Sequence, residues 1–225
     1  MNDKIRENIS RYQDESYAQK YKEEYKGGYR FKNIKSRIIA NREIAVTRSL
    51  LEDANITKAL GALLLDVPCG TGKIGKILSR YPIKILAGDL SSQMMALAAH
   101  EYSTDKFIGF LRFNAQNIPL NDKSVDYIVC LRLFQRLPKD IRINVLREFR
   151  RVLKHNLIVS YSYISPFQNL RNGIRRLYDR EKQDFYQESI AGIRLELNEA
   201  GFILKSIKHV LFSISSEIII LCETK

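Results

Sequence analysis

The sequence predicts an α/β fold built around a mainly parallel β-sheet, and three patterns lead to this prediction. An apolar run over residues 62–65 ends in an acid and is followed by a glycine-rich turn and a helix-like segment. Strand and helix patterns then alternate from residue 63 to residue 160, as in a parallel sheet with right-handed crossovers. The tail reads as two successive strands, over 202–212 and 214–222, and their short link forces them to pair antiparallel.

Length and composition favour one domain. The chain has 225 residues, of which 45% are hydrophobic, enough for one full core. No apolar stretch approaches the roughly 20 residues that span a bilayer, and the first residues are polar with mixed charge. The three cysteines are scattered and fit neither a disulfide framework nor a metal site. We therefore expect a cytoplasmic protein without a metal.

The turn after the first strand is the first candidate binding site. Gly70, Gly72 and Gly75 follow the strand, and the N–H groups of a turn and helix N-terminus there could hold a ligand. Their spacing, G-x-G-x-x-G, is also the dinucleotide fingerprint, so an NAD-dependent oxidoreductase is one alternative. Asp66 at the strand end favours another ligand, because its carboxylate would repel a pyrophosphate and attract a cation.

A second acid lies where the next strand ends. Asp89 follows the apolar run over residues 83–88, about twenty residues beyond the glycine turn, where a carboxylate can accept both ribose hydroxyls. Nicotinamide and methionine nucleotides share that requirement, so Asp89 indicates a nucleotide without choosing between them. Ser91 is also a favoured N-cap for the helix that begins there.

Five ordered segments resemble a known family. D-V-P-C-G-T-G resembles motif I of the class I S-adenosylmethionine-dependent methyltransferases, with Pro68 in place of the first glycine. G-D-L-S-S-Q-M-M and N-A-Q-N-I-P-L are similar to the next two motifs, and Asn114 replaces the usual acid of the second. Residues 123–130 and 149–154 resemble the fourth strand and the R-V-L-K helix end. The likeness is greatest to the methyltransferase type 11 group of bacterial enzymes.

This resemblance implies a Rossmann-like sandwich: a mainly parallel seven-stranded sheet with an antiparallel C-terminal hairpin and helices on both faces. It implies S-adenosyl-L-methionine as cofactor, with Leu90 and Met94 enclosing the adenine and Asn114 accepting a bond from its amino group. The cofactor-binding residues implied are Asp66, Val67, Pro68, Cys69, Gly70, Gly72, Asp89, Leu90, Met94, Asn114, Ala115, Gln116 and Leu131.

We expect one domain over residues 1–225 in four parts: an N-terminal helical cap (1–60), a cofactor-binding core (61–160), an acceptor-side insertion (161–190), and a C-terminal helix and hairpin (191–225). Tyr17, Tyr21 and Tyr25 share one helix face, which either packs on the core or closes over the cofactor. No catalytic residue is assigned, since relatives often carry a histidine pair where this chain has F-Q-R-L. The substrate-contact candidates, which follow strands four and five, are Arg132, Gln135, Arg136, Tyr161 and Tyr163.

The charge pattern concerns the acceptor. Residues 131–182 carry 13 Lys and Arg against 4 Asp and Glu, most of the formal net charge of +12. Such a field attracts an anionic or lipid-linked acceptor, and the basic helical pattern over 164–180 suits either an anionic membrane or a surface helix packed on the core. We expect methyl transfer to a small-molecule or anionic acceptor, without a clear nucleic-acid module or an obligate protein partner. The further alternatives are a non-catalytic S-adenosylmethionine-binding protein and an RNA methyltransferase.

Overall fold

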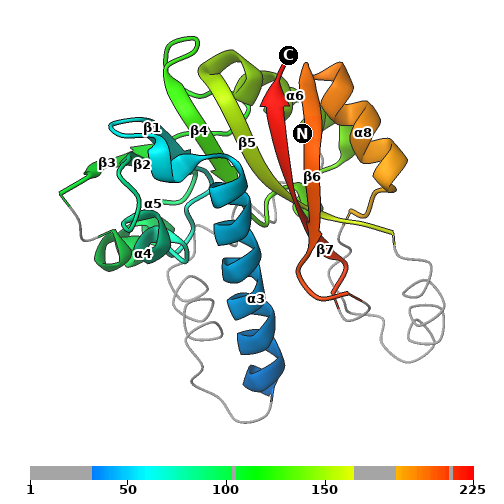
Figure 1. Cartoon of the computed structure of the whole chain (residues 1–225), viewed down its shortest axis with the longest axis horizontal. Helices are drawn as coiled ribbons and strands as arrows, with labels where there is room; N and C mark the ends of the chain where they lie inside the picture. Colours follow the sequence, from blue (N-terminus) through cyan, green and yellow to red (C-terminus); the bar gives the residue numbers. More distant parts are fainter. Residues whose placement is uncertain (1–31, 103–104, 165–185, 213–214) are drawn as a thin grey trace.

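The protein is built on one seven-stranded sheet. The computed structural model describes residues 32–102, 105–164, 186–212 and 215–225. The strand order is β3-β2-β1-β4-β5-β7-β6 (Figure 1). The strands are β1 (Leu63–Asp66), β2 (Lys84–Asp89), β3 (Phe107–Arg112), β4 (Val125–Cys130), β5 (Leu153–Ser162), β6 (Phe202–His209) and β7 (Glu217–Thr224).

Strands β1 to β5 are parallel, and β7 pairs antiparallel with both β5 and β6. This confirms the mainly parallel sheet with an antiparallel C-terminal hairpin. The chain builds outward from β1 to β3 and then returns to add β4 on the other side of β1. The order of the strands thus reverses between β1 and β4, and the carboxyl edge at such a point is where open α/β sheets bind ligands.

Helices cover both faces of the sheet, as expected (Figure 1). One core cluster joins α3 (Lys32–Asp53), α4 (Gly75–Leu78) and α5 (Ser92–Ala98) to one face, together with η1 (Ile56–Lys58) and residues next to η2 (Ala99–Glu101). The other cluster joins α6 (Lys139–Val152) and α8 (Ile190–Glu199) to the opposite face, with η3 (Phe134–Arg136) beside them. We refer to these as the α3 face and the α6 face.

Local signals explain several element boundaries. The side chain of Ser91 accepts a hydrogen bond from the N–H of Met94 and caps α5, which confirms the N-cap prediction. Ser189 caps α8 in the same way through the N–H of Gly192. The R-V-L-K segment is divided, because α6 ends at Val152 and β5 begins at Leu153. Within the described residues, no helix is long and apolar enough to cross a bilayer.

The expected N-terminal cap is described only from residue 32 onward. There α3 packs on the sheet through Val46, Leu50 and Leu51, all buried. The face of Tyr17, Tyr21 and Tyr25 and the basic segment over 165–185 lie outside the described residues, so the lid and membrane hypotheses stay predictions.

Candidate functional site

The glycine turn follows β1 at the carboxyl edge. Gly70 and Gly72 have positive φ values of 52° and 76°, a conformation that side-chain-bearing residues rarely adopt. A Cβ on Gly72 would lie 2.8 Å from Cβ of Glu101, and one on Gly75 would lie 2.6 Å from the Glu101 carbonyl oxygen. A Cβ on Gly70 would meet nothing within 4 Å. Two of the three glycines therefore let the turn pack against η2, and only Gly70 has open space beside it.

The hydrogen bonds of this turn correct one expectation. The N–H of Gly70 donates to Oδ2 of Asp89 at 2.8 Å, and the N–H groups of Cys69 and Gly72 donate to backbone carbonyls. The following helix, α4, has four residues and begins only at Gly75. The prediction that the backbone N–H groups of this turn are free is therefore wrong for Cys69, Gly70 and Gly72, and contact of the turn with a ligand stays a prediction.

Asp66, at the end of β1, is 2% exposed and accepts a hydrogen bond from the hydroxyl of Tyr102. Burial raises the pKa of Asp66 to about 7; the bond from Tyr102 opposes this rise and the charge of Asp89 adds to it. Tyr102 is itself 2% exposed and packs against Phe107 and Phe110. Asp66 is thus a rigidly held acid at the strand end, and Tyr102 is a site residue that the sequence patterns missed.

Asp89, at the end of β2, organises the neighbouring backbone. Its two oxygens accept hydrogen bonds from the N–H groups of Gly70 and Ser91, at 2.8 and 2.9 Å. The residue is 8% exposed, and burial raises its pKa. A carboxylate oxygen can accept more than one bond, so these contacts leave lone pairs for ribose hydroxyls. The structure brings Asp66 and Asp89 to the ends of adjacent strands, where Asp66 pairs with Ala87.

The remaining cofactor candidates surround the same edge. Met94 is 2% exposed, and Leu90 is partly buried. Asn114 is exposed, and its side-chain oxygen accepts a bond from the N–H of Gln116 at 3.0 Å, which closes a local turn. Leu131 follows β4 and is 9% exposed. Val67, Pro68 and Cys69 link β1 to the glycine turn, and Ala115 lies between Asn114 and Gln116, partly buried. Contacts of these residues with a cofactor stay predictions.

A group of buried charges lies on the β4 side of the turn. Arg132 has a left-handed φ of 61°. Its guanidinium donates hydrogen bonds to the carboxylate of Glu43 in α3, with Nε–Oε1 and Nη2–Oε2 distances of 2.9 and 2.6 Å. Lys73, within the glycine turn, also pairs with Glu43. Burial alone would raise the pKa of Glu43, but Arg132 and Lys73 hold it below its ordinary value. Arg132 was predicted near the acceptor; Glu43 and Lys73 were not.

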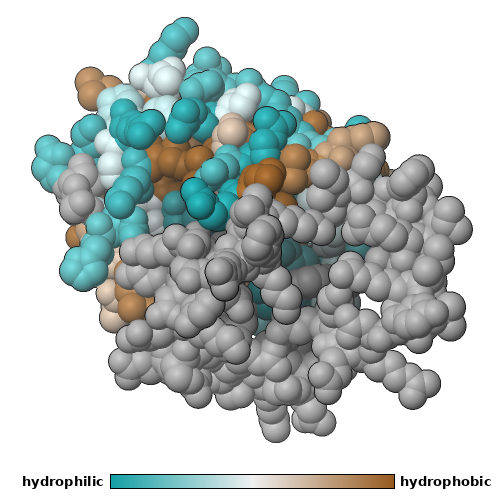
Figure 2. Space-filling model, turned by 90° about the horizontal axis from the view of Figure 1, so that it is seen from below, coloured by the Kyte–Doolittle hydropathy of each residue, from teal (hydrophilic) through white to brown (hydrophobic). Residues whose placement is uncertain are grey.

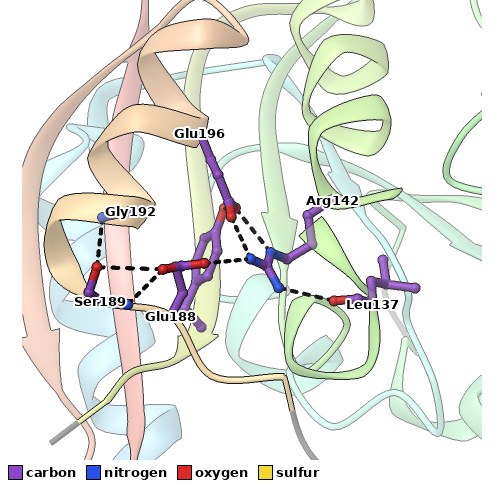
Figure 3. Close-up of polar contacts among 7 residues, drawn as sticks. Leu137, Arg142, Glu188, Ser189, Gly192 and Glu196 are labelled. Carbon is purple, nitrogen blue, oxygen red and sulfur yellow. Dashed lines mark hydrogen bonds and ion pairs between the residues drawn. The ribbon is translucent and has the colours of Figure 1, made fainter. Parts of the chain in front are cut away.

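Tyr161 is placed differently from the prediction. It is 1% exposed on the α6 face, and its hydroxyl lies 3.3 Å from Oε2 of Glu196. Figure 3 shows the surrounding ion pair, in which Arg142 of α6 bonds Glu196 and Glu188. Since β5 continues to Ser162, Tyr161 belongs to the sheet rather than to the expected insertion. It is a core residue that joins α6 and α8, and the prediction of a substrate contact is not supported.

The other acceptor-side candidates stay at the carboxyl edge. Gln135 has a buried side-chain oxygen that finds no hydrogen-bond partner within the described ranges, and its backbone carbonyl accepts from the N–H of Tyr186 at 2.8 Å. Arg136 is partly buried in η3. Tyr163 is 7% exposed, with its ring 5.0 Å from that of His209. Their contact with an acceptor stays a prediction.

The basic excess of residues 131–154 is largely balanced by carboxylates from elsewhere in the fold. Arg147 pairs with Glu199, and Arg151 with Asp122 and Glu148. Lys154 pairs with Asp126. The sequence suggested that the cations of this region attract anions. In its described part, many of them instead form ion pairs within the protein. The rest of the region, from 165 to 182, lies outside the described residues.

This sheet order, with a glycine turn and two buried carboxylates on adjacent strands, defines a Rossmann-like class I methyltransferase fold. Among solved structures, the chain is similar to magnesium protoporphyrin IX methyltransferase from Synechocystis with bound SAH. The TM-score is 0.73 and the identity 17%, over 88% of this chain and 89% of that one. It is also similar to the [4+2]-cyclase SpnF, with a TM-score of 0.61 and 18% identity over 80% of each chain.

Sequence comparison gives the family. Residues 65–159 match the family described as a methyltransferase domain, so the chain carries a class I S-adenosylmethionine-dependent methyltransferase domain. An uncharacterized protein of Rickettsia prowazekii is 30% identical over 156 residues, 67% of this chain. The malonyl-[acyl-carrier protein] O-methyltransferase of Pectobacterium atrosepticum is 33% identical over 66 residues, 29% of this chain. The chain spans 60% of the length of the Rickettsia protein and 25% of the Pectobacterium one.

Proposed function

We propose that the chain binds S-adenosyl-L-methionine and transfers its methyl group to an acceptor. The observation that carries this proposal is the pair of buried acids, Asp66 and Asp89, beside a turn in which the N–H of Gly70 is bonded to Asp89. Asp66 suits the α-ammonium of the cofactor, and Asp89 suits its ribose hydroxyls. The N–H of Gly70, which would serve a pyrophosphate in a dinucleotide site, is bonded to Asp89 at 2.8 Å. This favours the methionine nucleotide over NAD.

The mechanism needs little from side chains. The sulfonium is already an activated donor, so in-line displacement requires an acceptor lone pair held about 3–3.5 Å from the methyl carbon. The chain's task is to hold both reactants and to take up a proton where the acceptor carries one. We propose a small molecule as acceptor, since no described element forms a recognisable nucleic-acid-binding module.

The test is thermal unfolding of the full chain with S-adenosylmethionine, S-adenosylhomocysteine or NAD. A ligand at 100 times its dissociation constant adds about 2.7 kcal/mol, and each kcal/mol moves Tm by roughly 2–4 °C for a chain of this size. We expect a rise of about 5–10 °C with either methionine nucleotide and none with NAD. A rise with NAD alone would refute the proposal.

Matched variants locate the site. Asp66→Asn removes the carboxylate that we assign to the cofactor's ammonium, and we expect it to abolish most of the shift with both methionine nucleotides. Asp140→Asn changes an exposed acid in the first turn of α6 and serves as the control. If Asp66→Asn folds and keeps the full shift, the assignment of Asp66 is wrong even where the cofactor is right.

A further inference from the structure

A second polar group lies at the carboxyl edge besides the cofactor motifs. Its members are Glu43, Lys73, Arg132, Ser160 and Glu217, and we call it the edge cluster. They come from α3, the glycine turn, the segment after β4, and strands β5 and β7. Because β7 runs antiparallel to β5, its first residue, Glu217, lies opposite Ser162 at the carboxyl end of β5. Figure 2 views the molecule from below, with the residues outside the described ranges in grey.

The sheet order gives the cluster its place relative to the cofactor, and this step rests on the proposed function. Asp89 lies on β2, to one side of β1, whereas β4, β5 and β7 lie to the other side. A nucleoside with its ribose at Asp89 and its ammonium at Asp66 reaches across the end of β1. Its sulfonium would then lie on the side of β4 and Arg132. The edge cluster is therefore on the side from which an acceptor approaches the methyl group.

Glu217 is the member whose bonds are incomplete. It is 8% exposed, and its Oε1 has no hydrogen-bond partner among the described residues. The Ser160 hydroxyl bonds its carboxyl group, and the Ser160 oxygen in turn accepts the N–H of Arg132 at 2.7 Å. Glu43, by contrast, is bonded through both oxygens. A buried polar atom without a partner destabilises the fold by about 1–3 kcal/mol, so such an atom at a binding edge points to a ligand.

The electrostatic surroundings of Glu217 bring its pKa close to neutral pH, where the carboxyl group can exchange a proton. Burial raises its pKa to about 7 and the charge of Glu43 adds to the rise, while Arg132, Lys73 and Ser160 oppose it. On β6, the nearby His209 packs against Tyr163 on the opposite face. By formal charge the edge cluster is +1 when Glu217 is neutral and zero when it is ionised. A sulfonium beside the cluster therefore favours ionised Glu217.

We propose that Glu217 is the base that takes the proton from the acceptor, an O–H or N–H compound, and that its ionisation is coupled to the cofactor's sulfonium. The acceptor's lone pair forms the new bond to the methyl carbon. The carbon–sulfur bond breaks and its electron pair stays on sulfur, which becomes a neutral thioether. The acceptor's proton moves to Oε1 of Glu217. As the positive charge leaves sulfur, the proton affinity of Glu217 rises, so the base strengthens during the step that needs it.

The test compares two nucleotides that differ in one charge. S-adenosylmethionine has the sulfonium and S-adenosylhomocysteine does not, while both carry the ammonium that faces Asp66. Titration of Asp66 therefore cancels in the ratio Kd(S-adenosylhomocysteine)/Kd(S-adenosylmethionine). Calorimetry on the full chain between about pH 5.5 and pH 8 should show this ratio rising about fivefold or more, the lower end of typical coupling between sites. Glu217→Gln should flatten the rise. Glu223→Gln changes a half-exposed acid at the other end of the same strand, where it pairs with Lys205, and should leave the rise unchanged.

A second measurement needs no variant. Because the sulfonium ionises Glu217, binding of S-adenosylmethionine at pH 7 should release about half a proton more than binding of S-adenosylhomocysteine. Titrations in two buffers of different ionisation enthalpy measure this difference. Any of three results would overturn the proposal. The Kd ratio could stay constant with pH, the two nucleotides could release equal numbers of protons, or the rise of the ratio with pH could persist in Glu217→Gln. Failure of both nucleotides to bind would overturn the cofactor assignment itself, which separates the two failures.

Discussion

The hydroxyl of Tyr102 donates a hydrogen bond to Asp66, the acid that we assign to the cofactor's ammonium. A single substitution can test whether this bond holds the acid in place and lowers its pKa. Tyr102→Phe removes the hydroxyl donor and keeps the ring, which lies 5.0 Å from that of Phe107 and 5.7 Å from that of Phe110. A hydrogen bond to a charged group contributes about 1.5–3 kcal/mol, and one to a neutral group about 0.5–1.5 kcal/mol. Because the pKa of Asp66 is about 7, the acid is mostly charged at about pH 8.5 and mostly neutral at about pH 5.5.

We therefore expect Tyr102→Phe to lower Tm by about 3–12 °C at the higher pH and by about 1–6 °C at the lower. The variant should also shift the pKa of Asp66 upward, since the lost bond favours the charged form. Binding of S-adenosylmethionine should then begin to weaken at a higher pH than in the unmodified chain. Thermal unfolding and calorimetric titration at several pH values measure both effects.

Tyr81→Phe is the matched control. Tyr81 is another buried tyrosine, 7% exposed, and no carboxylate among the described residues accepts a bond from its hydroxyl. We expect its effect to be small and equal at both pH values. Losses of equal size at both pH values for Tyr102→Phe would show that the hydroxyl does not serve a titrating acid, and the reasoning would fail.

Three further outcomes follow from packing and charge. Gly75→Ala would place a Cβ 2.6 Å from the Glu101 carbonyl oxygen, so we expect a loss of about 1–3 kcal/mol in thermal unfolding; an unchanged Tm would contradict the tight packing. Arg142→Ala leaves Glu196 buried without its cation, and urea unfolding should show a loss of about 3–5 kcal/mol, whereas a loss below 1 kcal/mol would refute the pairing. Glu217 has a folded pKa of about 7 against an ordinary 4.5, so it stabilises the fold most below pH 4.5 and loses this contribution as the pH rises through 7. Glu217→Gln should remove about 3 kcal/mol of this pH dependence, and an unchanged pH profile would contradict the raised pKa.

The sequence was sufficient for the parts of the fold that depend on local pattern. Strands β1, β2 and β4 are short, largely apolar runs, and the pairing of β6 and β7 follows from the short link between them. Asp66 and Asp89 were predictable because each ends such a run. Parallel strands then bring their carboxyl ends to one edge without further information.

The rest of the site depends on contacts between distant residues. Glu43 lies on a helix rich in charges, and nothing in its spacing distinguishes it from solvent-exposed neighbours; its burial depends on Lys73 and Arg132, 30 and 89 residues away. Glu217 is the first residue of a largely apolar strand, so its place in the site depends on the register of β7 against β5. Tyr161 was misplaced because β5 runs on to Ser162, and this extension is fixed by its pairing with the distant strand β7.

The described residues on either side of 165–185 are hydrogen-bonded to each other and to neighbouring elements of the fold. The N–H of Ile164 bonds the carbonyl of Glu188 at 2.9 Å, the N–H of Tyr163 bonds Ser216 at 2.8 Å, and the N–H of Tyr186 bonds Gln135 at 2.8 Å. Because these bonds hold the flanking residues together, replacing the segment between them changes the loop-closure entropy of the fold only slightly. The segment between these anchors can therefore be exchanged while the hydrogen bonds that hold the carboxyl edge of the sheet stay in place.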